Sequence, residues 1–338
     1  MTGPDLLRTL PCDGSDGPSG PTLAAGLHAA GLVRRGGALA HHPADPGALL
    51  ALLRDTGAAS LSAGRILEGH VNAIKLLVLH GGPVAPDLLS GVWGADGPDP
   101  VRIEGDVLRG QKLYASGADV LDRVIVTART DRGVRLVLLT RDALAGRLHP
   151  GEWRMSGMRA TASGRCDLDG VPLAHAVLLG APGAYLVEPH FHGGVWRYGA
   201  VQLGAMRELT RIAARQLRDS GRIAAPLQAM RLHRMIAACE TAEMWLTRAA
   251  HEVEHPDAPP AAAETAILAR LRTAEEAATV MAEADRALGA GSHATGHPAD
   301  RIRRDLGLYL RQADPDGLAL AQVARIADTA DLNRRWIG

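Results

Sequence analysis

Hydrophobic residues recur at spacings of three and four between residues 47 and 82, which is the period of an amphipathic helix. The repeat breaks once and resumes with Leu61, Ile66 and Leu67. The sequence Gly81-Gly82-Pro83 then ends it, because glycine and proline interrupt helices. The pattern predicts two helices here, preceded by a Gly/Pro/Ser-rich loop at residues 12–22.

The pattern changes between residues 91 and 186, where short apolar and β-branched runs are separated by Gly, Pro and Asp. These runs lie at residues 101–103, 123–127 and 134–139. Many short strands with turn signals between them are typical of an antiparallel sandwich or barrel.

Long helical patterns return from about residue 195 to the end of the chain. Segments 256–260 and 289–296, rich in Pro or Gly, separate them, and long helices with short connections form a bundle. The predicted helices span residues 195–220, 226–254, 261–288 and 317–336. We therefore predict an α+β fold with a short N-terminal helical region (1–90), a central antiparallel β-barrel or sandwich (91–187) and a C-terminal four-helix bundle (188–338).

Composition excludes several classes of protein. Basic residues (Lys plus Arg) and acidic residues (Asp plus Glu) number 37 each. The chain therefore lacks the excess positive charge that binding to nucleic acid or an anionic membrane would favour. The three cysteines are dispersed and form no CxxC pattern, which fits a reducing compartment. With no signal peptide and no apolar run of about 18 residues, we expect a soluble cytoplasmic protein.

The segment 157–164 (GMRATASG) contains two hydroxyl residues, Thr161 and Ser163, between glycines. Such a loop brings backbone N–H groups and hydroxyls close to a planar ligand, because glycine allows the backbone to approach. Turns in β proteins use the same residues for purely structural reasons. The loop alone leaves both interpretations open.

Three further segments give this loop a context: 108–117 (LRGQKLYASG), 218–228 with its Arg and Gln, and 288–305 ending in RIRRD. In this order, and with helices on both sides of a β domain, the chain resembles the acyl-CoA dehydrogenase superfamily of flavoenzymes. The similarity extends over roughly residues 60–320.

The resemblance implies bound FAD. It places residues of the β domain beside the isoalloxazine ring and residues of the bundle at the diphosphate end of a neighbouring subunit's FAD. It therefore implies a homodimer or homotetramer and allows for an electron-transfer partner. Hydroxyl and aromatic side chains suit a ring that needs donors and an apolar wall. The candidate FAD contacts are Trp93, Tyr114, Ser116, Thr161, Ser163, Arg218, Gln228, Gly289 and Gly291.

Two departures from the family concern catalysis. Members of this family use a glutamate to remove a proton alpha to a thioester, but Ala313 and Gly194 stand in the two regions where that glutamate is expected. The N-terminal region is also short. Glu68 and His70 are the replacement candidates, although Arg65 and Glu68 also have the spacing of an intrahelical ion pair. Other carboxylates near the expected positions are Glu188, Asp314 and Asp316.

The sequence thus predicts a FAD-dependent oxidoreductase acting on the CH–CH group of an acyl thioester or a related small-molecule substrate. A flavin monooxygenase of the same fold and an inactive ligand-binding scaffold are the alternatives. The segment 251–255 (HEVEH) matches the HExxH zinc motif. Because Pro256 ends the helix there and no third ligand is evident, we expect no metal site.

Overall fold

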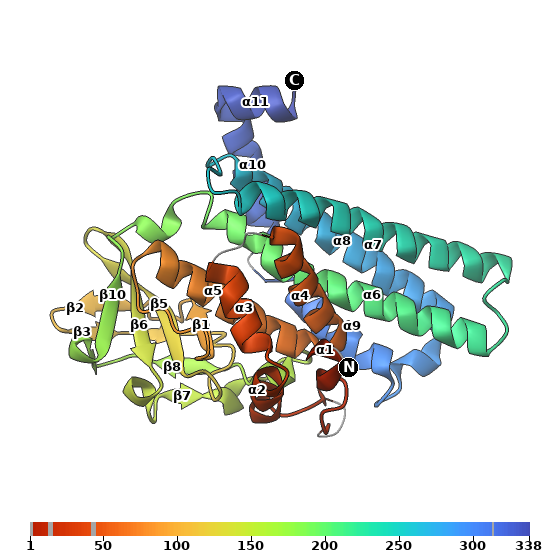
Figure 1. Cartoon of the computed structure of the whole chain (residues 1–338), viewed down its shortest axis with the longest axis horizontal. Helices are drawn as coiled ribbons and strands as arrows, with labels where there is room; N and C mark the ends of the chain where they lie inside the picture. Colours follow the sequence, from red (N-terminus) through yellow and green to blue (C-terminus); the bar gives the residue numbers. More distant parts are fainter. Residues whose placement is uncertain (1–2, 13–15, 42–44, 313) are drawn as a thin grey trace.

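The N-terminal part of the chain is helical, and these helices lie at the centre of the molecule (Figure 1). The computed structural model describes residues 3–12, 16–41, 45–312 and 314–338. Asp45 accepts the N–H of Ala48 and Ser60 accepts that of Ala63, so a polar side chain caps the start of each predicted helix. The N-terminal helices are α1 (Gly3–Leu7), α2 (Gly20–Ala29), α3 (Leu32–His41), α4 (Pro46–Ala59) and α5 (Leu61–Leu79).

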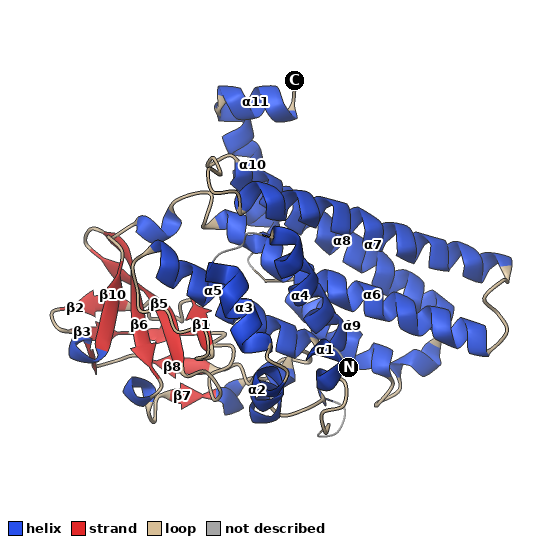
Figure 2. Ribbon diagram, in the orientation of Figure 1, coloured by secondary structure: helices blue, strands red, loops and turns tan. Residues whose placement is uncertain are grey.

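The β domain follows and forms two sheets at one end of the molecule (Figure 2). The larger sheet has the order β10-β6-β5-β2-β3-β9, with β1 also paired to β5, and the smaller has the order β4-β8-β7. Most pairs are antiparallel, as predicted, but β1 and β2 run parallel to β5. The strands are β1 (Ser90–Trp93), β2 (Arg102–Glu104), β3 (Val107–Arg109), β4 (Gln111–Lys112), β5 (Arg123–Thr130), β6 (Gly133–Thr140), β7 (Leu148–His149), β8 (Arg165–Asp167), β9 (Val171–Pro172) and β10 (Ala176–Leu179).

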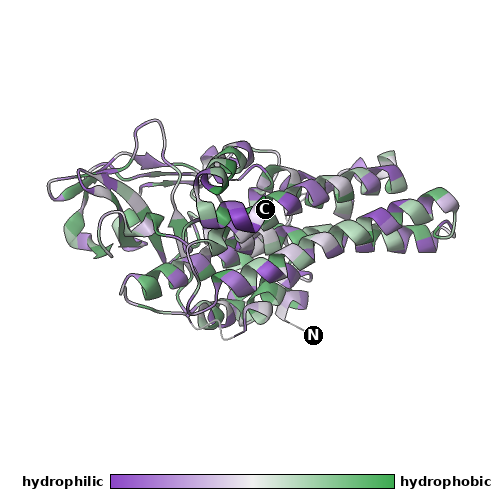
Figure 3. Cartoon of the chain, turned by 90° about the horizontal axis from the view of Figure 1, so that it is seen from above, coloured by the Kyte–Doolittle hydropathy of each residue, from purple (hydrophilic) through white to green (hydrophobic). Residues whose placement is uncertain are grey.

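Three long helices and one shorter helix extend away from the β domain (Figure 1). Hydrophilic and hydrophobic residues are mixed along them, as expected for helices with one buried face (Figure 3). Helix α4 crosses α6 closely, and a Cβ on Gly204 would lie 2.0 Å from the carbonyl oxygen of Arg54. The helices are α6 (Trp196–Asp219), α7 (Pro226–Val253), α8 (Ala262–Leu288) and α9 (Pro298–Tyr309).

The prediction of one continuous helix over residues 317–336 is wrong. This segment forms two helices, α10 (Pro315–Asp328) and α11 (Ala330–Trp336), because Thr329 between them is extended. The Thr329 carbonyl accepts the N–H of Asn333 and starts a new helix. The α+β class and the order helices, sheets, helices are confirmed. Among the described residues, no helix has the length and hydropathy required to cross a bilayer.

Candidate functional site

A cavity of about 1120 Å³ lies where α5, the β domain and the start of the bundle meet. This volume exceeds the 300–1,000 Å³ that is usual for a site holding one small molecule. Only ten aromatic residues occur in the chain, and seven of them line this cavity, including all four tyrosines. The protein therefore uses its few aromatic rings mainly as cavity walls. The seven are Trp93, Tyr114, Trp153, Tyr185, Phe191, Tyr198 and Tyr309.

The β-domain wall of the cavity contains five of the candidate FAD contacts: Trp93, Tyr114, Ser116, Thr161 and Ser163. Two backbone hydrogen bonds join the segments that carry them, from Ala115 N to Gly164 O and from Gly117 N to Thr161 O, both 2.8 Å. The hydroxyl oxygen of Ser163 lies 2.7 Å from that of Thr161 and 3.2 Å from that of Ser116. Residues 47 positions apart, Ser116 and Ser163, thus belong to one continuous chain of hydroxyls.

Aromatic side chains border these hydroxyls. The Trp93 indole N–H donates to the Ser116 carbonyl over 3.0 Å, which fixes the ring in the wall. Tyr114 and Trp153 meet edge to face with centroids 5.9 Å apart. Tyr114 and Met158 also have positive φ angles of 51° and 55°, a conformation that costs about 1–3 kcal/mol and that clusters at functional sites.

The loop 157–164 is held from behind by α9. The N–H of Met158 donates to Asp305 over 2.6 Å, and a Cβ on Gly157 would lie 2.2 Å from the carbonyl oxygen of Arg304. Burial raises the pKa of Asp305 to about 6. A glycine is required at 157 because the helix backbone fills the space of a side chain.

The helical wall of the cavity contains the buried carboxylate of Glu68, which is 1% exposed. Arg65 donates to one of its oxygens over 2.6 Å, and Asn72 donates to the other. Glu68 is thus both a cavity residue and a member of the ion pair that its spacing from Arg65 predicted. Neither carboxylate oxygen is free of a protein donor.

A second buried carboxylate, Glu254, lies behind this wall. It accepts hydrogen bonds from Arg197, from Lys75 over 3.0 Å and from the Trp196 indole. Burial by itself would raise the pKa of Glu254, but Arg197 and Lys75 outweigh burial and hold the pKa at about 2. Arg197 also donates to Asn72, so the two buried carboxylates belong to one network.

His70 does not line the cavity, although it is the second catalytic candidate. Its Nδ1 accepts the N–H of Ser90, so its Nε2 carries the proton and donates to the Val33 carbonyl. Burial lowers its pKa to about 4. Both ring nitrogens of His70 hold backbone groups, so His70 links α5, α3 and β1 and, unlike Glu68, lies outside the cavity lining.

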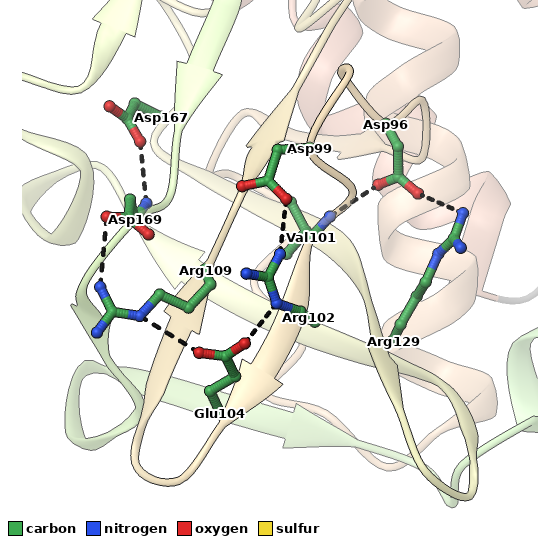
Figure 4. Close-up of polar contacts among 9 residues, drawn as sticks. All are labelled: Asp96, Asp99, Val101, Arg102, Glu104, Arg109, Arg129, Asp167 and Asp169. Carbon is green, nitrogen blue, oxygen red and sulfur yellow. Dashed lines mark hydrogen bonds and ion pairs between the residues drawn. The ribbon is translucent and has the colours of Figure 1, made fainter.

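The β domain adds a second carboxylate, Asp96, to the cavity lining. Asp96 pairs with Lys112 and Arg129 and accepts the N–H of Val101, and Figure 4 shows the last two contacts. Burial lowers the pKa of the Lys112 amine. Glu188, by contrast, is absent from the lining and pairs with His192. Both described carboxylates that line the cavity therefore have cationic partners.

Comparison with known proteins places this site on a known scaffold. No protein-family model and no curated protein matches the sequence. Solved structures do match over most of the chain. Nitroalkane oxidase from Podospora anserina aligns with a TM-score of 0.78 and 19% identity, covering 92% of this chain and 87% of that one. TdsC from Paenibacillus sp. A11-2, solved with FMN and indole, gives 0.73 and 18%, covering 89% of each chain.

KijD3, solved with FMN and a dTDP-linked amino sugar, gives a TM-score of 0.69 and 20% identity and covers 95% of this chain and 96% of that one. All three are acyl-CoA dehydrogenase-like flavoproteins. The chain has an acyl-CoA dehydrogenase-like fold. The resemblance drawn from the sequence is confirmed at the level of the fold.

Within this acyl-CoA dehydrogenase-like fold, the other four candidate FAD contacts lie away from the cavity. Arg218 is at the end of α6, Gln228 is at the start of α7, and Gly289 and Gly291 follow α8. Arg231, which donates to Gln228 in its own helix over 3.3 Å, joins the start of α7 to the end of α8 by donating to the Arg286 carbonyl over 3.0 Å. They gather at the end of the bundle farthest from the β domain (Figure 1). Within one chain, the candidates therefore form two separate groups.

The structure shows what occupies the two regions where the family places its glutamate. Gly194 lines the cavity and brings no carboxylate to it. Ala313 lies outside the described residues, but its neighbours Arg311 and Gln312 line the cavity. Asp314 caps α10 by accepting the N–H of Gly317. This loop thus reaches the cavity, as the resemblance implies. Its described polar residues in the lining are Arg311 and Gln312.

The HEVEH segment has structural roles. Glu252 accepts hydrogen bonds from Arg248, Arg335 and Thr265, and His255 accepts the N–H of Asp257. In the described part of the chain, no three His, Cys, Asp or Glu side chains lie together in an arrangement suited to a metal ion.

Sequence analysis did not single out several residues of the cavity lining, namely Asn72, Tyr185, Arg197, Tyr198 and Tyr309. The scarcity of aromatic residues was an available signal for the tyrosines. In a chain whose core is built from Leu, Ala, Val and Ile, each aromatic ring is a candidate for another role.

Proposed function

We propose that this protein is a flavin-dependent oxidoreductase whose isoalloxazine ring lies along the β-domain wall. The observation that carries this proposal is the chain of hydroxyls on Ser116, Ser163 and Thr161 beside the fixed indole of Trp93. Such a wall supplies an apolar face and polar donors or acceptors for the ring edge. When bound, a flavin accepts a hydride or two electrons from a substrate. The cavity volume leaves room for that substrate next to the ring.

We further propose FAD as the flavin and a homodimer as its host. Arg218, Gln228, Gly289 and Gly291 are remote from the cavity of their own chain, so they reach a diphosphate only at the site of a second copy. A guanidinium suits a diphosphate because it donates two parallel hydrogen bonds to phosphate oxygens. FMN, as in the solved TdsC and KijD3, would need none of these four residues.

An oxygen-dependent monooxygenase reaction is favoured over dehydrogenation of an acyl thioester. Dehydrogenation requires a base to remove the alpha proton, and a base must have a free acceptor atom within hydrogen-bond reach. Glu68 and Asp96 both have cationic partners, which opposes that role. Dehydrogenation remains the second candidate because Glu68 does line the cavity on α5.

Flavin titration is the first experiment. Purified protein should bind FAD or FMN with a perturbed absorption spectrum, and Thr161→Val should weaken binding several-fold because it removes a hydroxyl at nearly constant volume. Thr210→Val is the matched control on α6, outside the cavity lining. Failure to bind either flavin would contradict the proposal and favour the scaffold interpretation.

The second experiment separates the two reactions in the loaded protein. Rapid oxygen consumption after chemical reduction of the flavin supports the monooxygenase. Anaerobic bleaching of the flavin by a series of acyl-CoA thioesters supports the dehydrogenase. Loss of this bleaching in Glu68→Gln would identify Glu68 as the base.

A further inference from the structure

The end of the cavity between α6 and α9 contains two hydroxyls without partners. Tyr198 and Tyr309 line the cavity and are only 5% and 3% exposed. Among the described residues, neither hydroxyl has a hydrogen-bond partner. Buried tyrosine hydroxyls usually find one, since an unpaired buried polar group costs free energy. Both are therefore available to a ligand in the cavity.

The two tyrosines are also held in place. Their ring centroids lie 6.3 Å apart, and the Gln202 side-chain amide donates to the Tyr309 carbonyl over 3.2 Å. Burial raises the pKa of each hydroxyl, so both stay protonated and able to donate at neutral pH. The pair is thus a preformed set of donors.

A buried cation lies against the ring of Tyr198. Arg270, on α8, is 1% exposed, and its guanidinium carbon lies 5.1 Å from the centroid of the Tyr198 ring. It donates to the carbonyls of Leu310 and Gln312 over 2.7 and 3.2 Å, while its Nε and Nη1 have no partner in the described part of the chain. No carboxylate of the described residues pairs with it.

This end of the cavity consequently has an excess positive charge. The nearby carboxylate, Glu68, is already paired with Arg65 over 2.6 Å, which leaves the charge of Arg270 uncompensated. A buried charge without a counter-charge is unfavourable, and an anion at the tyrosine hydroxyls would reduce that cost. Hydrogen bonds to an anionic acceptor are also stronger than those to a neutral one.

We propose that Tyr198 and Tyr309 bind a carboxylate or other anionic oxygen of the substrate, with Arg270 stabilising the charge from behind. The substrate class is a small carboxylate or similar oxyanion, held with its remaining atoms along the aromatic walls. This inference rests on the proposed function for the adjacent flavin ring, but the anion site itself is formed by the helices alone.

Carboxylate binding tests the proposal with defined probes. Benzoate and hexanoate, each compared with its neutral amide, should be titrated by calorimetry into the protein with and without flavin. At least one carboxylate should bind about tenfold or more tightly than its amide. Equal affinity for acid and amide, or no binding of either carboxylate, would overturn the proposal. Flavin binding is recorded separately, so a protein that binds carboxylate without flavin would contradict only the proposed function.

Isosteric variants locate the site. Tyr309→Phe and Tyr198→Phe should each weaken carboxylate binding about tenfold, since each removes one hydrogen bond to a charged group. Tyr185→Phe is the matched control, because its hydroxyl lines the same cavity on the side of Gly94. It should change the affinity by less than about twofold. A control effect as large as that of Tyr309→Phe would contradict the assignment, and flavin affinity reports whether each variant retains its fold.

Discussion

The two walls of the cavity satisfy their polar groups in different ways. On the β-domain wall, the hydroxyls of Thr161 and Ser163 bond to one another and to backbone within neighbouring loops. Behind the helical wall, Glu254 bonds to Arg197 and Lys75 from two other helices, while the hydroxyls of Tyr198 and Tyr309 on the wall itself have no partner among the described residues. The first arrangement suits a rigid cofactor that stays in place. The second keeps donors available for a molecule that enters and leaves.

The helical wall should be the more fragile of the two. Glu254→Ala removes the carboxylate that pairs with Arg197 and Lys75, and Arg197 is 4% exposed. Leaving a buried arginine unpaired should lower the free energy of unfolding by about 3–5 kcal/mol. Urea unfolding followed by tryptophan fluorescence measures this change.

Glu252→Ala is the control for that prediction. It removes a carboxylate two residues earlier, in the last turn of α7, whose charged partners Arg248 and Arg335 are 47% and 33% exposed. A loss of about 1 kcal/mol or less is expected. Similar losses in the two variants would show that the buried network has no special role.

Acid should affect the supports of the two walls in opposite directions. His70 lies under the helical wall and has a folded-state pKa of about 4 against a usual 6.5, so the unfolded state binds more protons between these values. Stability from His70 is therefore lost as the pH falls from 6.5 to 4, by up to about 3 kcal/mol.

Asp305, behind the β-domain loop, has the opposite effect. Its folded-state pKa of about 6 exceeds the usual 3.8, so the folded state binds more protons between these values. Stability from Asp305 rises as the pH falls from 6 to 3.8, again by up to about 3 kcal/mol. The two contributions nearly cancel in the wild-type protein.

Two single variants separate these contributions. Asp305→Asn, which keeps an acceptor for the Met158 N–H, should be more acid-sensitive than wild type by about 2–3 kcal/mol between pH 7 and 4.5. His70→Asn should be less acid-sensitive by a similar amount. Urea unfolding at both pH values gives the comparison, and parallel pH profiles for all three proteins would contradict both assignments.

The difference between the walls also explains what the sequence could predict. Ser116, Thr161 and Ser163 occur in short local motifs, so the resemblance carried them to the cavity. Helix α5 was predictable from its apolar period, yet that period cannot say which polar residue faces a cavity. Glu68 and His70 are two residues apart, and only tertiary packing separates the cavity carboxylate from the structural histidine.

The network that supports the helical wall joins residues far apart in the sequence, such as Lys75 and Glu254, which are 179 positions apart. No local spacing encodes such a pair. The break at Thr329 was missed for a related reason, because the apolar period continues through it while the backbone does not.

The smallest predicted effect concerns the residues that belong to neither wall of their own chain. Arg218→Ala should weaken FAD binding about tenfold, because one charge-assisted hydrogen bond contributes about that much to affinity. It should leave FMN binding unchanged. The reason is that FMN lacks the second phosphate and the adenosine that the far end of the bundle would contact. Arg215→Ala is the matched control, since it removes an exposed arginine of the same helix. Equal weakening of FAD and FMN would place Arg218 outside the diphosphate site. An FAD-selective loss in a protein that sediments as a dimer would show that the cavity is completed by a second copy.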